Sequence, residues 1–257
     1  MCGIIDMQNS RFNIIHAITA TVLVLAIYLC RSPAALWRQF VYGYEHPLTA
    51  EMIRLGLVAS GVSMGVIAAA LFASTLFARR QTELRASGTL ASAEPELKPN
   101  RLQATRLALC VAPGVIAVAI GLQLLTAKSI EWIWGIHVAD QGLVKFFLSP
   151  SCTVGLKVHI VLSILLEAPI VEEALFRGVI FRGFARSLPV PSAMAISGFL
   201  FAVVHMNAAS FFGVWFLGLA FAWIYARTRT ILAPILLHGL FNAFNLVLLL
   251  FFPELVT

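Results

Sequence analysis

Three ionisable side chains within six residues, Glu172, Glu173 and Arg177, lie in a largely apolar run that extends from residue 158 to residue 181. A charged side chain in mid-membrane costs from about 3 kcal/mol on insertion scales to far more in simulations, so it persists only where it is paired, hydrated or used in chemistry. Residues four apart share one face of a helix, which predicts an ion pair between Glu173 and Arg177. Glu172 points elsewhere and remains free to act as an acid or a base. The alternative is that all three side chains only hold neighbouring helices together.

Further polar side chains recur at helical spacing in the apolar runs that follow. His205 comes four residues after Phe201, and His238 is followed four residues later by Asn242 and then by Asn245. Either histidine alone is more often a structural residue than a catalytic one. Their joint occurrence with two acids and an arginine, in segments nearly free of other polar groups, predicts a hydrated site inside a helical bundle.

The depth of these residues follows from the helical rise of about 1.5 Å per residue. This rise places Glu172 and His205 at similar depths, about 20 Å from the connection between their helices, so that they can meet. It places His238 only about 10 Å from the start of its own helix. Either the last helix is therefore offset, or the helix that carries Glu172 bends near Pro169 or Gly178.

The residue types suit hydrolysis of a peptide bond. A buried carboxylate can accept a proton from water, and a neighbouring imidazole can relay that proton. Asparagine and histidine side chains can stabilise an oxyanion, at about 3 to 4 kcal/mol per donor. The sequence contains no serine elbow, HExxH or GxGxxG motif, which argues against serine proteases, common metalloproteases and nucleotide-binding proteins.

Three motifs together resemble the signature of the CPBP family of intramembrane proteases, which includes type II CAAX prenyl endopeptidases and bacteriocin-processing or self-immunity proteins. In this chain they are Glu172-Glu173-x-x-x-Arg177, Phe201-x-x-x-His205 and His238-x-x-x-Asn242. The resemblance covers about residues 156 to 248, and the first 150 residues resemble no family that we can name.

The resemblance implies a role for each residue. Glu172 and His205 would activate the attacking water, and His238 and Asn242 would form the oxyanion site. The supporting residues would be Glu173, Arg177, Phe201 and Asn245. The resemblance favours a glutamate mechanism without a metal or other cofactor. The alternative is zinc bound by Glu172, His205 and His238, since these residue types can also ligate that metal.

The composition predicts an all-α, polytopic membrane protein. Of the 257 residues, 60% are hydrophobic and 12% are charged, and the mean hydropathy is +0.91, well outside the usual globular range. We expect about seven transmembrane helices plus interfacial helices. The predicted spans are about 12–30, 52–78, 105–126, 155–184, 191–206, 211–226 and 231–252. The net charge of +6 comes from basic residues at the ends of these spans, which argues against a nucleic-acid partner.

Two regions are predicted. Residues 1–150 would form an N-terminal region of three spans, with a polar loop at 79–104, a kink at Pro113-Gly114 and an amphipathic interfacial segment at 128–150. Residues 151–257 would form a four-helix catalytic core. Most Lys and Arg residues then lie on one side, which predicts a cytoplasmic N-terminus and a C-terminus on the opposite side.

The sequence therefore predicts an intramembrane endopeptidase whose partners are the lipid bilayer and a membrane-anchored or lipidated peptide substrate. Prenylated CAAX tails, leader peptides and C-terminal sorting tails all remain possible substrates. One alternative is a catalytically silent scaffold or immunity protein of the same fold. A transporter or proton relay is the other, although it would predict broken helices in paired half-repeats, and the sequence shows none.

Overall fold

The computed structural model describes residues 100–135 and 142–252, and every regular element in this part of the chain is a helix. The helices are α4 (Arg101–Trp134), α5 (Gly142–Leu148), α6 (Val154–Leu162), η1 (Ser163–Glu167), α7 (Ala168–Leu175), η2 (Phe176–Phe181), α8 (Arg182–Ala185), α9 (Val190–Val204), α10 (Phe211–Thr228) and α11 (Leu232–Phe251). The predicted membrane helical bundle is thus confirmed, whereas the first two predicted spans and the loop at 79–99 lie outside the described residues.

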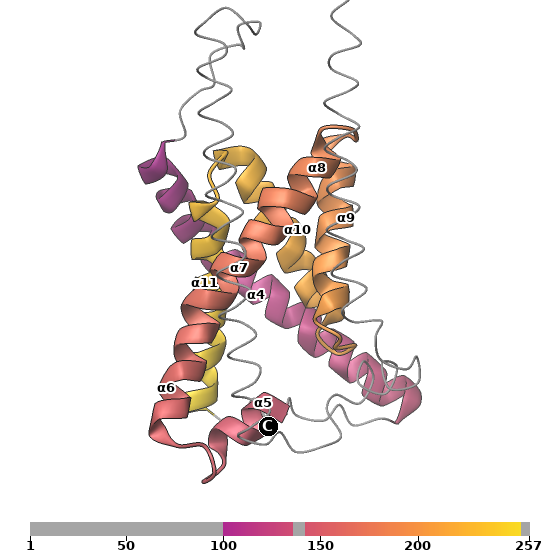
Figure 1. The fold of residues 1–257 in the computed structure, drawn as a ribbon. Coiled ribbons are helices and arrows are strands. Elements are labelled where there is room, and N and C mark those ends of the chain that lie inside the picture. The colour runs from indigo at the N-terminus through magenta and orange to yellow at the C-terminus, as the bar shows by residue number, and fades with distance from the viewer. Residues whose placement is uncertain (1–99, 136–141, 253–257) are drawn as a thin grey trace, which may run out of the picture.

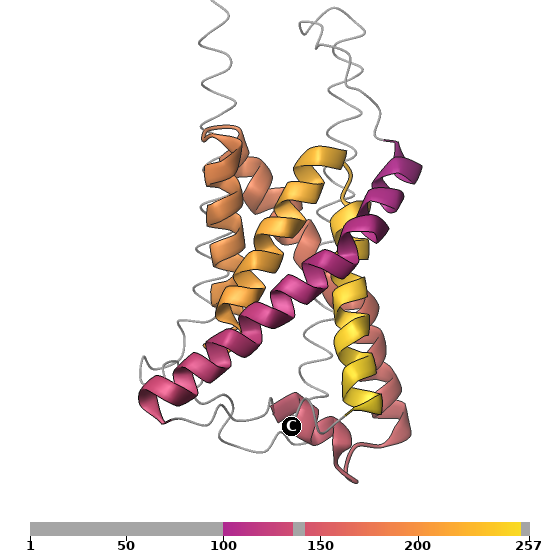
Figure 2. The ribbon, with the colours of Figure 1, turned by 180° about the vertical axis from the view of Figure 1, so that it is seen from behind.

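Four helical stretches in the described part are long and apolar enough to cross a membrane: Arg101–Trp134, Val154–Ala185, Phe211–Thr228 and Leu232–Phe251. The fifth apolar helix, α9, is shorter. Figures 1 and 2 show α10 and α11 between the long helix that contains α7 on one side and α4 on the other. The exact number of seven spans is not confirmed.

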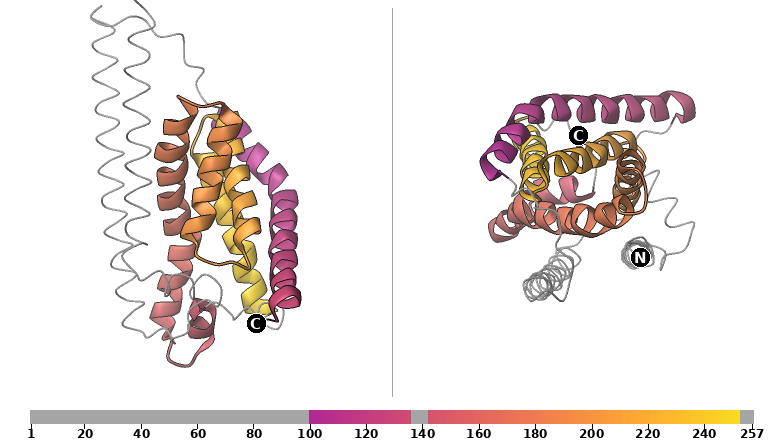
Figure 3. Two further views of the ribbon diagram at one scale, coloured as in Figure 1. Left: turned by 90° about the vertical axis from the view of Figure 1, so that its right-hand side faces the viewer. Right: turned by 90° about the horizontal axis from the view of Figure 1, so that it is seen from above.

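Helix α4 packs on α10 and α11 through small residues. Ala104, Ala108, Ala112 and Ala119 repeat at helical spacing and are at most 5% exposed, which lets the helix axes come close together. The two views of Figure 3 show that α4 changes direction along its length, and Pro113 lies inside this helix. A proline removes one backbone hydrogen bond and bends a helix.

The predicted division of the chain at residue 150 stays a prediction.

The predicted interfacial segment at 128–150 stays a prediction, and its described residues belong to two different helices. Residues 128–134 continue α4, because no proline or glycine lies between Gly121 and Gly135, which ends the helix in the left-handed conformation at φ 64°. The 34 residues of α4 span about 51 Å, more than the roughly 30 Å of a bilayer core, and the helix runs obliquely in Figure 2. Helix α5 is a separate short helix, held by Phe146 and Phe147 against the α6 and α11 ends.

The helix predicted at 155–184 is observed at Val154–Ala185, but it is not uniform. Two π-helical segments, η1 and η2, flank the two turns of α7 that carry Glu172 and Glu173. Each π segment widens the helix locally and changes the direction in which the following side chains point, and such segments are frequent at functional sites.

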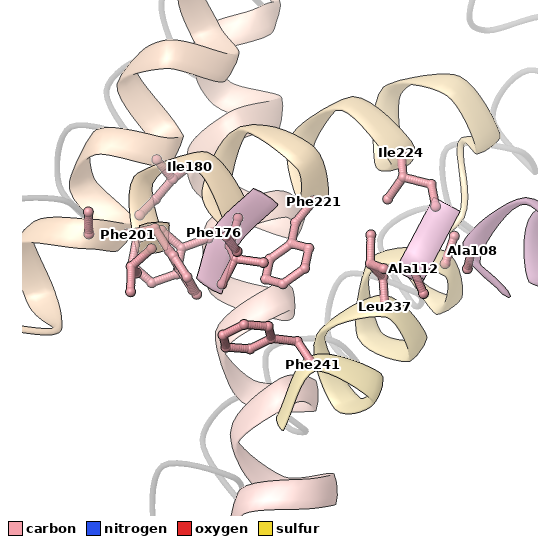
Figure 4. Packing of buried hydrophobic residues seen from close by; sticks show 14 of the residues in the cluster. Ala108, Ala112, Phe176, Ile180, Phe201, Phe221, Ile224, Leu237 and Phe241 are labelled. Atoms are coloured by element: carbon pink, nitrogen blue, oxygen red, sulfur yellow. The ribbon is translucent and has the colours of Figure 1, made fainter. Parts of the chain in front are cut away.

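The core nearest α7 is aromatic. Phe176, Phe201 and Phe221 come from η2, α9 and α10 and lie together, with Phe241 of α11 close by (Figure 4). Phe176 meets Phe201 edge to face, with ring centroids 5.1 Å apart. These large side chains fill the space among four helices and border the polar residues of the site.

Candidate active site

Glu173 lies at the centre of a buried cluster with Arg177 and His238. Its Oε1 atom is 3.1 Å from Nη1 of Arg177 and 3.1 Å from Nδ1 of His238. Both Glu173 and Arg177 are fully buried, and Nη2 of Arg177 donates to the Gly218 carbonyl at 2.9 Å. The predicted Glu173–Arg177 ion pair is confirmed, and it joins α7 and η2 to α10 and α11.

Aromatic rings surround the guanidinium of Arg177. Its central carbon lies 4.7 Å from the ring centroid of Phe201, 5.2 Å from that of Phe221 and 5.8 Å from that of Phe176. The imidazole of His238 stacks on Phe221 with centroids 4.9 Å apart. Cation–π contacts of this kind are strongest where the cation is desolvated, so the rings help to keep Arg177 charged inside the bundle.

Glu172 and His205 form the second and more open pair. Oε2 of Glu172 lies 3.8 Å from Nε2 of His205, and the two side chains are 30% and 34% exposed. This separation is too long for a direct hydrogen bond. Oε2 of Glu172 has no hydrogen-bond partner within the described part of the chain. The structure therefore confirms that the two residues meet, and it leaves Oε2 of Glu172 shielded from solvent and without a hydrogen-bond partner among the described residues.

The tautomer of His205 follows from its other nitrogen. Nδ1 lies 2.7 Å from the Phe201 carbonyl oxygen, which can only accept a hydrogen bond, so Nδ1 carries a proton. In the neutral imidazole, Nε2 then presents its lone pair toward Glu172. The ring of Phe201 packs against the imidazole with centroids 4.6 Å apart, which fixes its orientation further.

His205 lies at the end of α9, where the chain turns. It is the C-cap of that helix, and the next residue, Met206, adopts a left-handed conformation at φ 48°. This conformation is costly for a residue with a side chain, by roughly 1 to 2 kcal/mol. The turn ends the helix at His205 and leaves its imidazole about one-third exposed.

The depth of His238 is explained by the start of α11. In Figure 2 the connection at 229–231 descends from the end of α10, so that α11 begins deeper in the bundle than α10 ends. The last helix is therefore offset, which is one of the two possibilities that the sequence left open. This offset brings His238 to Glu173, the residue that follows Glu172.

The two asparagines of α11 bond to backbone carbonyls. Nδ2 of Asn242 donates to the Ile164 carbonyl at 2.8 Å, and Nδ2 of Asn245 donates to the Phe241 carbonyl at 2.9 Å. Asn242 thus ties α11 to η1. An amide nitrogen has two hydrogens, so Asn242 retains a second donor.

His238 and Asn242 are the predicted oxyanion pair. No contact among the described residues directs both side chains at one common point. Because the carboxylate of Glu173 accepts from Nδ1 of His238, a neutral His238 has no hydrogen on Nε2. It can donate from Nε2 only as an imidazolium. The oxyanion role stays a prediction with this added condition.

The described residues contain no group of three His, Cys, Asp or Glu side chains placed to hold a metal ion. His238 turns to Glu173, whereas His205 turns to Glu172. The ligand set considered for zinc, Glu172, His205 and His238, is therefore not brought together in this arrangement, and three protein ligands are the usual minimum for catalytic zinc.

Several residues around the site were not predicted from the sequence. Oγ of Ser163 donates to Oε2 of Glu167 at 2.7 Å within η1, and the Gly218 carbonyl accepts from Arg177. The spacing of four between Ser163 and Glu167 in an apolar run is a signal that could have identified the pair. Gly218 could not be found in this way, since it contributes only its backbone.

Comparisons with known proteins agree with the motifs. Residues 154–244 match the family model described as type II CAAX prenyl endopeptidase Rce1-like. The putative membrane peptidase YdiL of Bacillus subtilis (strain 168) is 35% identical over 80 residues, which cover 31% of this chain and 33% of that protein. The match thus spans about a third of the length of this curated relative, and no solved structure matches the chain.

These matches confirm the resemblance to the CPBP family of proteases for the region that carries the three motifs. Together with the long apolar helices, they identify an integral membrane protein with an Rce1-like domain.

Proposed function

We propose that the protein is an intramembrane endopeptidase that hydrolyses a peptide bond of a lipid-anchored or membrane-embedded protein or peptide. The observation that carries the proposal is the approach of Glu172 to His205, with Oε2 of Glu172 3.8 Å from Nε2 of His205. A water in this gap can lose a proton to Glu172 or His205 while it attacks the carbonyl carbon.

The same pair can complete the reaction. Attack by the oxygen of water gives a tetrahedral oxyanion, and the C–N bond then breaks as the amine nitrogen takes up the proton that Glu172 or His205 holds. Asn242 and an imidazolium form of His238 would donate hydrogen bonds to the oxyanion. No step in this mechanism uses a metal.

The buried cluster has a different role in the proposal. Glu173, Arg177 and His238 neutralise and hydrogen-bond one another inside the bundle. They fix α7 against α10 and α11, and hence fix the position of Glu172, which is the next residue to Glu173. This is the supporting role expected for Glu173 and Arg177.

The test is a comparison of membrane peptides from cells that produce the wild-type protein or Glu172→Gln. We expect a set of membrane-anchored peptides to be cleaved only with the wild type. Glu131→Gln is a control, since it removes the charge of an acid at the far end of α4, and it should preserve the cleavage pattern. An identical peptide set for all three proteins would instead favour a catalytically silent scaffold of the same fold.

A further inference from the structure

One end of the described bundle is rich in arginine. The start of α4, the end of α8 and the end of α10 all lie at the top of the bundle in Figures 1 and 2. The six arginines at these positions are all exposed: Arg101, Arg106, Arg182, Arg186, Arg227 and Arg229. They flank the ends of apolar spans, where the phosphate groups of a bilayer lie.

These arginines have no acidic partner in the part of the chain that the structure describes. Its acids are Glu131, Glu167, Glu172 and Glu173, and none of them belongs to this end of the bundle. The opposite end differs, because Lys128 pairs with Glu131 at 3.1 Å and Lys157 lies 5.4 Å from the Phe147 ring centroid. Among the described residues, a group of arginines without an acidic partner is thus found at this end of the bundle.

Arg182 and Arg186 form the best-defined part of this charged end. Arg182 is the first residue of α8, and Arg186, four residues later, is its C-cap. The two side chains therefore share one face of the helix. Burial lowers the pKa of the Arg186 guanidinium and the neighbouring Arg182 lowers it further, while Tyr225 of α10 acts in the opposite direction. Two like charges are therefore held close together beside a tyrosine, an arrangement that an anion would stabilise.

The core beneath the two arginines is apolar. Phe181, Ala193 and Ala222 are buried where α8, α9 and α10 meet, and Phe184 and Tyr225 pack against them. The rings of Phe181 and Tyr225 meet edge to face, with centroids 5.8 Å apart. The Tyr225 hydroxyl has no hydrogen bond to another described residue, so it can donate to a ligand.

We propose that Arg182, Arg186 and Tyr225 bind the phosphate headgroup of an anionic phospholipid at the junction of α8, α9 and α10. Guanidinium groups bind phosphate oxygens with charge-assisted hydrogen bonds, and the acyl chains of such a lipid would lie along the apolar spans that end at these residues. Charge complementarity and the depth of the residues at the span ends both favour a lipid. The site is separate from Glu172 and His205, so the proposal does not depend on proteolysis.

The experiment uses the full-length protein purified in detergent and native mass spectrometry with phosphatidylglycerol or phosphatidylcholine of the same acyl chains. The wild type should bind phosphatidylglycerol more tightly. Each basic residue near an anionic surface contributes about fivefold to binding, so Arg182→Gln/Arg186→Gln should lower the affinity for phosphatidylglycerol about 30-fold. Tyr225→Phe should lower it by a smaller factor.

The matched control is Arg101→Gln/Arg106→Gln, which removes the same charge from α4 at the same end of the bundle. It should change the affinity by less than about threefold, a factor below that of one basic residue. Equal losses in both double variants would overturn the proposal in favour of diffuse surface charge. A wild type that binds both lipids equally would overturn it as well. Unchanged thermal unfolding of each lipid-free variant shows that the comparison is made on folded protein.

Discussion

Two neighbouring glutamates, Glu172 and Glu173, have opposite environments although they are adjacent in the sequence. Glu173 is fully buried and shares its Oε1 with Arg177 and His238, whereas the Glu172 side chain is 30% exposed and faces His205. The difference arises because adjacent helical side chains diverge by about 100°. One carboxylate is thereby neutralised as part of the structure, and the other is available to a water and a substrate.

Substitutions should separate these two environments. Arg177→Ala leaves Glu173 buried without its ion-pair partner, and breaking a buried pair costs about 3 to 5 kcal/mol. Glu172→Gln removes no ion pair of this kind and should leave the free energy of unfolding nearly unchanged. Thermal unfolding of the purified proteins in detergent measures both. Equal losses of stability in the two variants would refute this division of roles.

A second prediction at the residue scale concerns zinc. Because Glu172 is proposed to receive a proton from water directly, activity should persist after long treatment with a strong, membrane-permeant chelator. Cleavage of a membrane peptide before and after chelation, with zinc measured by elemental analysis, provides the test. Stoichiometric zinc, together with activity that is lost on chelation and restored by zinc, would show that a metal activates the water.

At the scale of the elements, apolar runs predicted the helices of the described C-terminal part well. The spans expected at 211–226 and 231–252 correspond to α10 and α11, because their ends coincide with polar or helix-ending residues such as Ser210 and Arg229. The π segments η1 and η2 could not be predicted in this way. They change the backbone hydrogen bonding inside a continuous apolar run and leave its hydrophobic pattern almost intact.

The crossing of α9 and α10 gives a prediction for Gly218. A Cβ at this position would lie 2.6 Å from the Gly198 Cα and 2.9 Å from its carbonyl oxygen. Gly218→Ala must therefore separate the helices, at about 1 to 3 kcal/mol, and it shifts the carbonyl that binds Arg177. Unfolding in detergent should show this loss.

The matched control for Gly218 is Gly121→Ala in α4, where a Cβ meets nothing within 4 Å. Alanine favours a helix over glycine by up to about 1 kcal/mol, so this variant should be as stable as the wild type or slightly more so. Equal destabilisation by the two alanines would mean that the close crossing at Gly218 is not what limits substitution there.

At the scale of the whole molecule, the sequence predicted most residues of the site but not all of the contacts between them. The acids, His205 and His238 were found because ionisable groups are rare in apolar spans. The contact of His238 with Glu173 could not be found, since it depends on the depth at which α11 begins. That depth is set by the connection at 229–231 and by packing against α4, neither of which leaves a periodic pattern in the sequence.

The orientation of the chain in the membrane is predicted from its basic residues. A cysteine introduced at Ser92, in a variant without native cysteines, should react with a membrane-impermeant thiol reagent only from the cytoplasm. A cysteine at Asp140 should react only from the other side. The reverse labelling would invert the orientation and move the arginine-rich end of the bundle to the external face.

The central claim, that Glu172 is the base of an intramembrane protease, is tested most directly by single-turnover cleavage in liposomes. The substrate would be a membrane peptide cleaved by the wild type, and the comparison would be between the wild type and folded Glu172→Gln. General base catalysis contributes about 10²- to 10⁴-fold to such reactions. We predict a loss of at least about 100-fold in the cleavage rate, with substrate binding retained. A rate for Glu172→Gln within a few-fold of the wild type would contradict the claim.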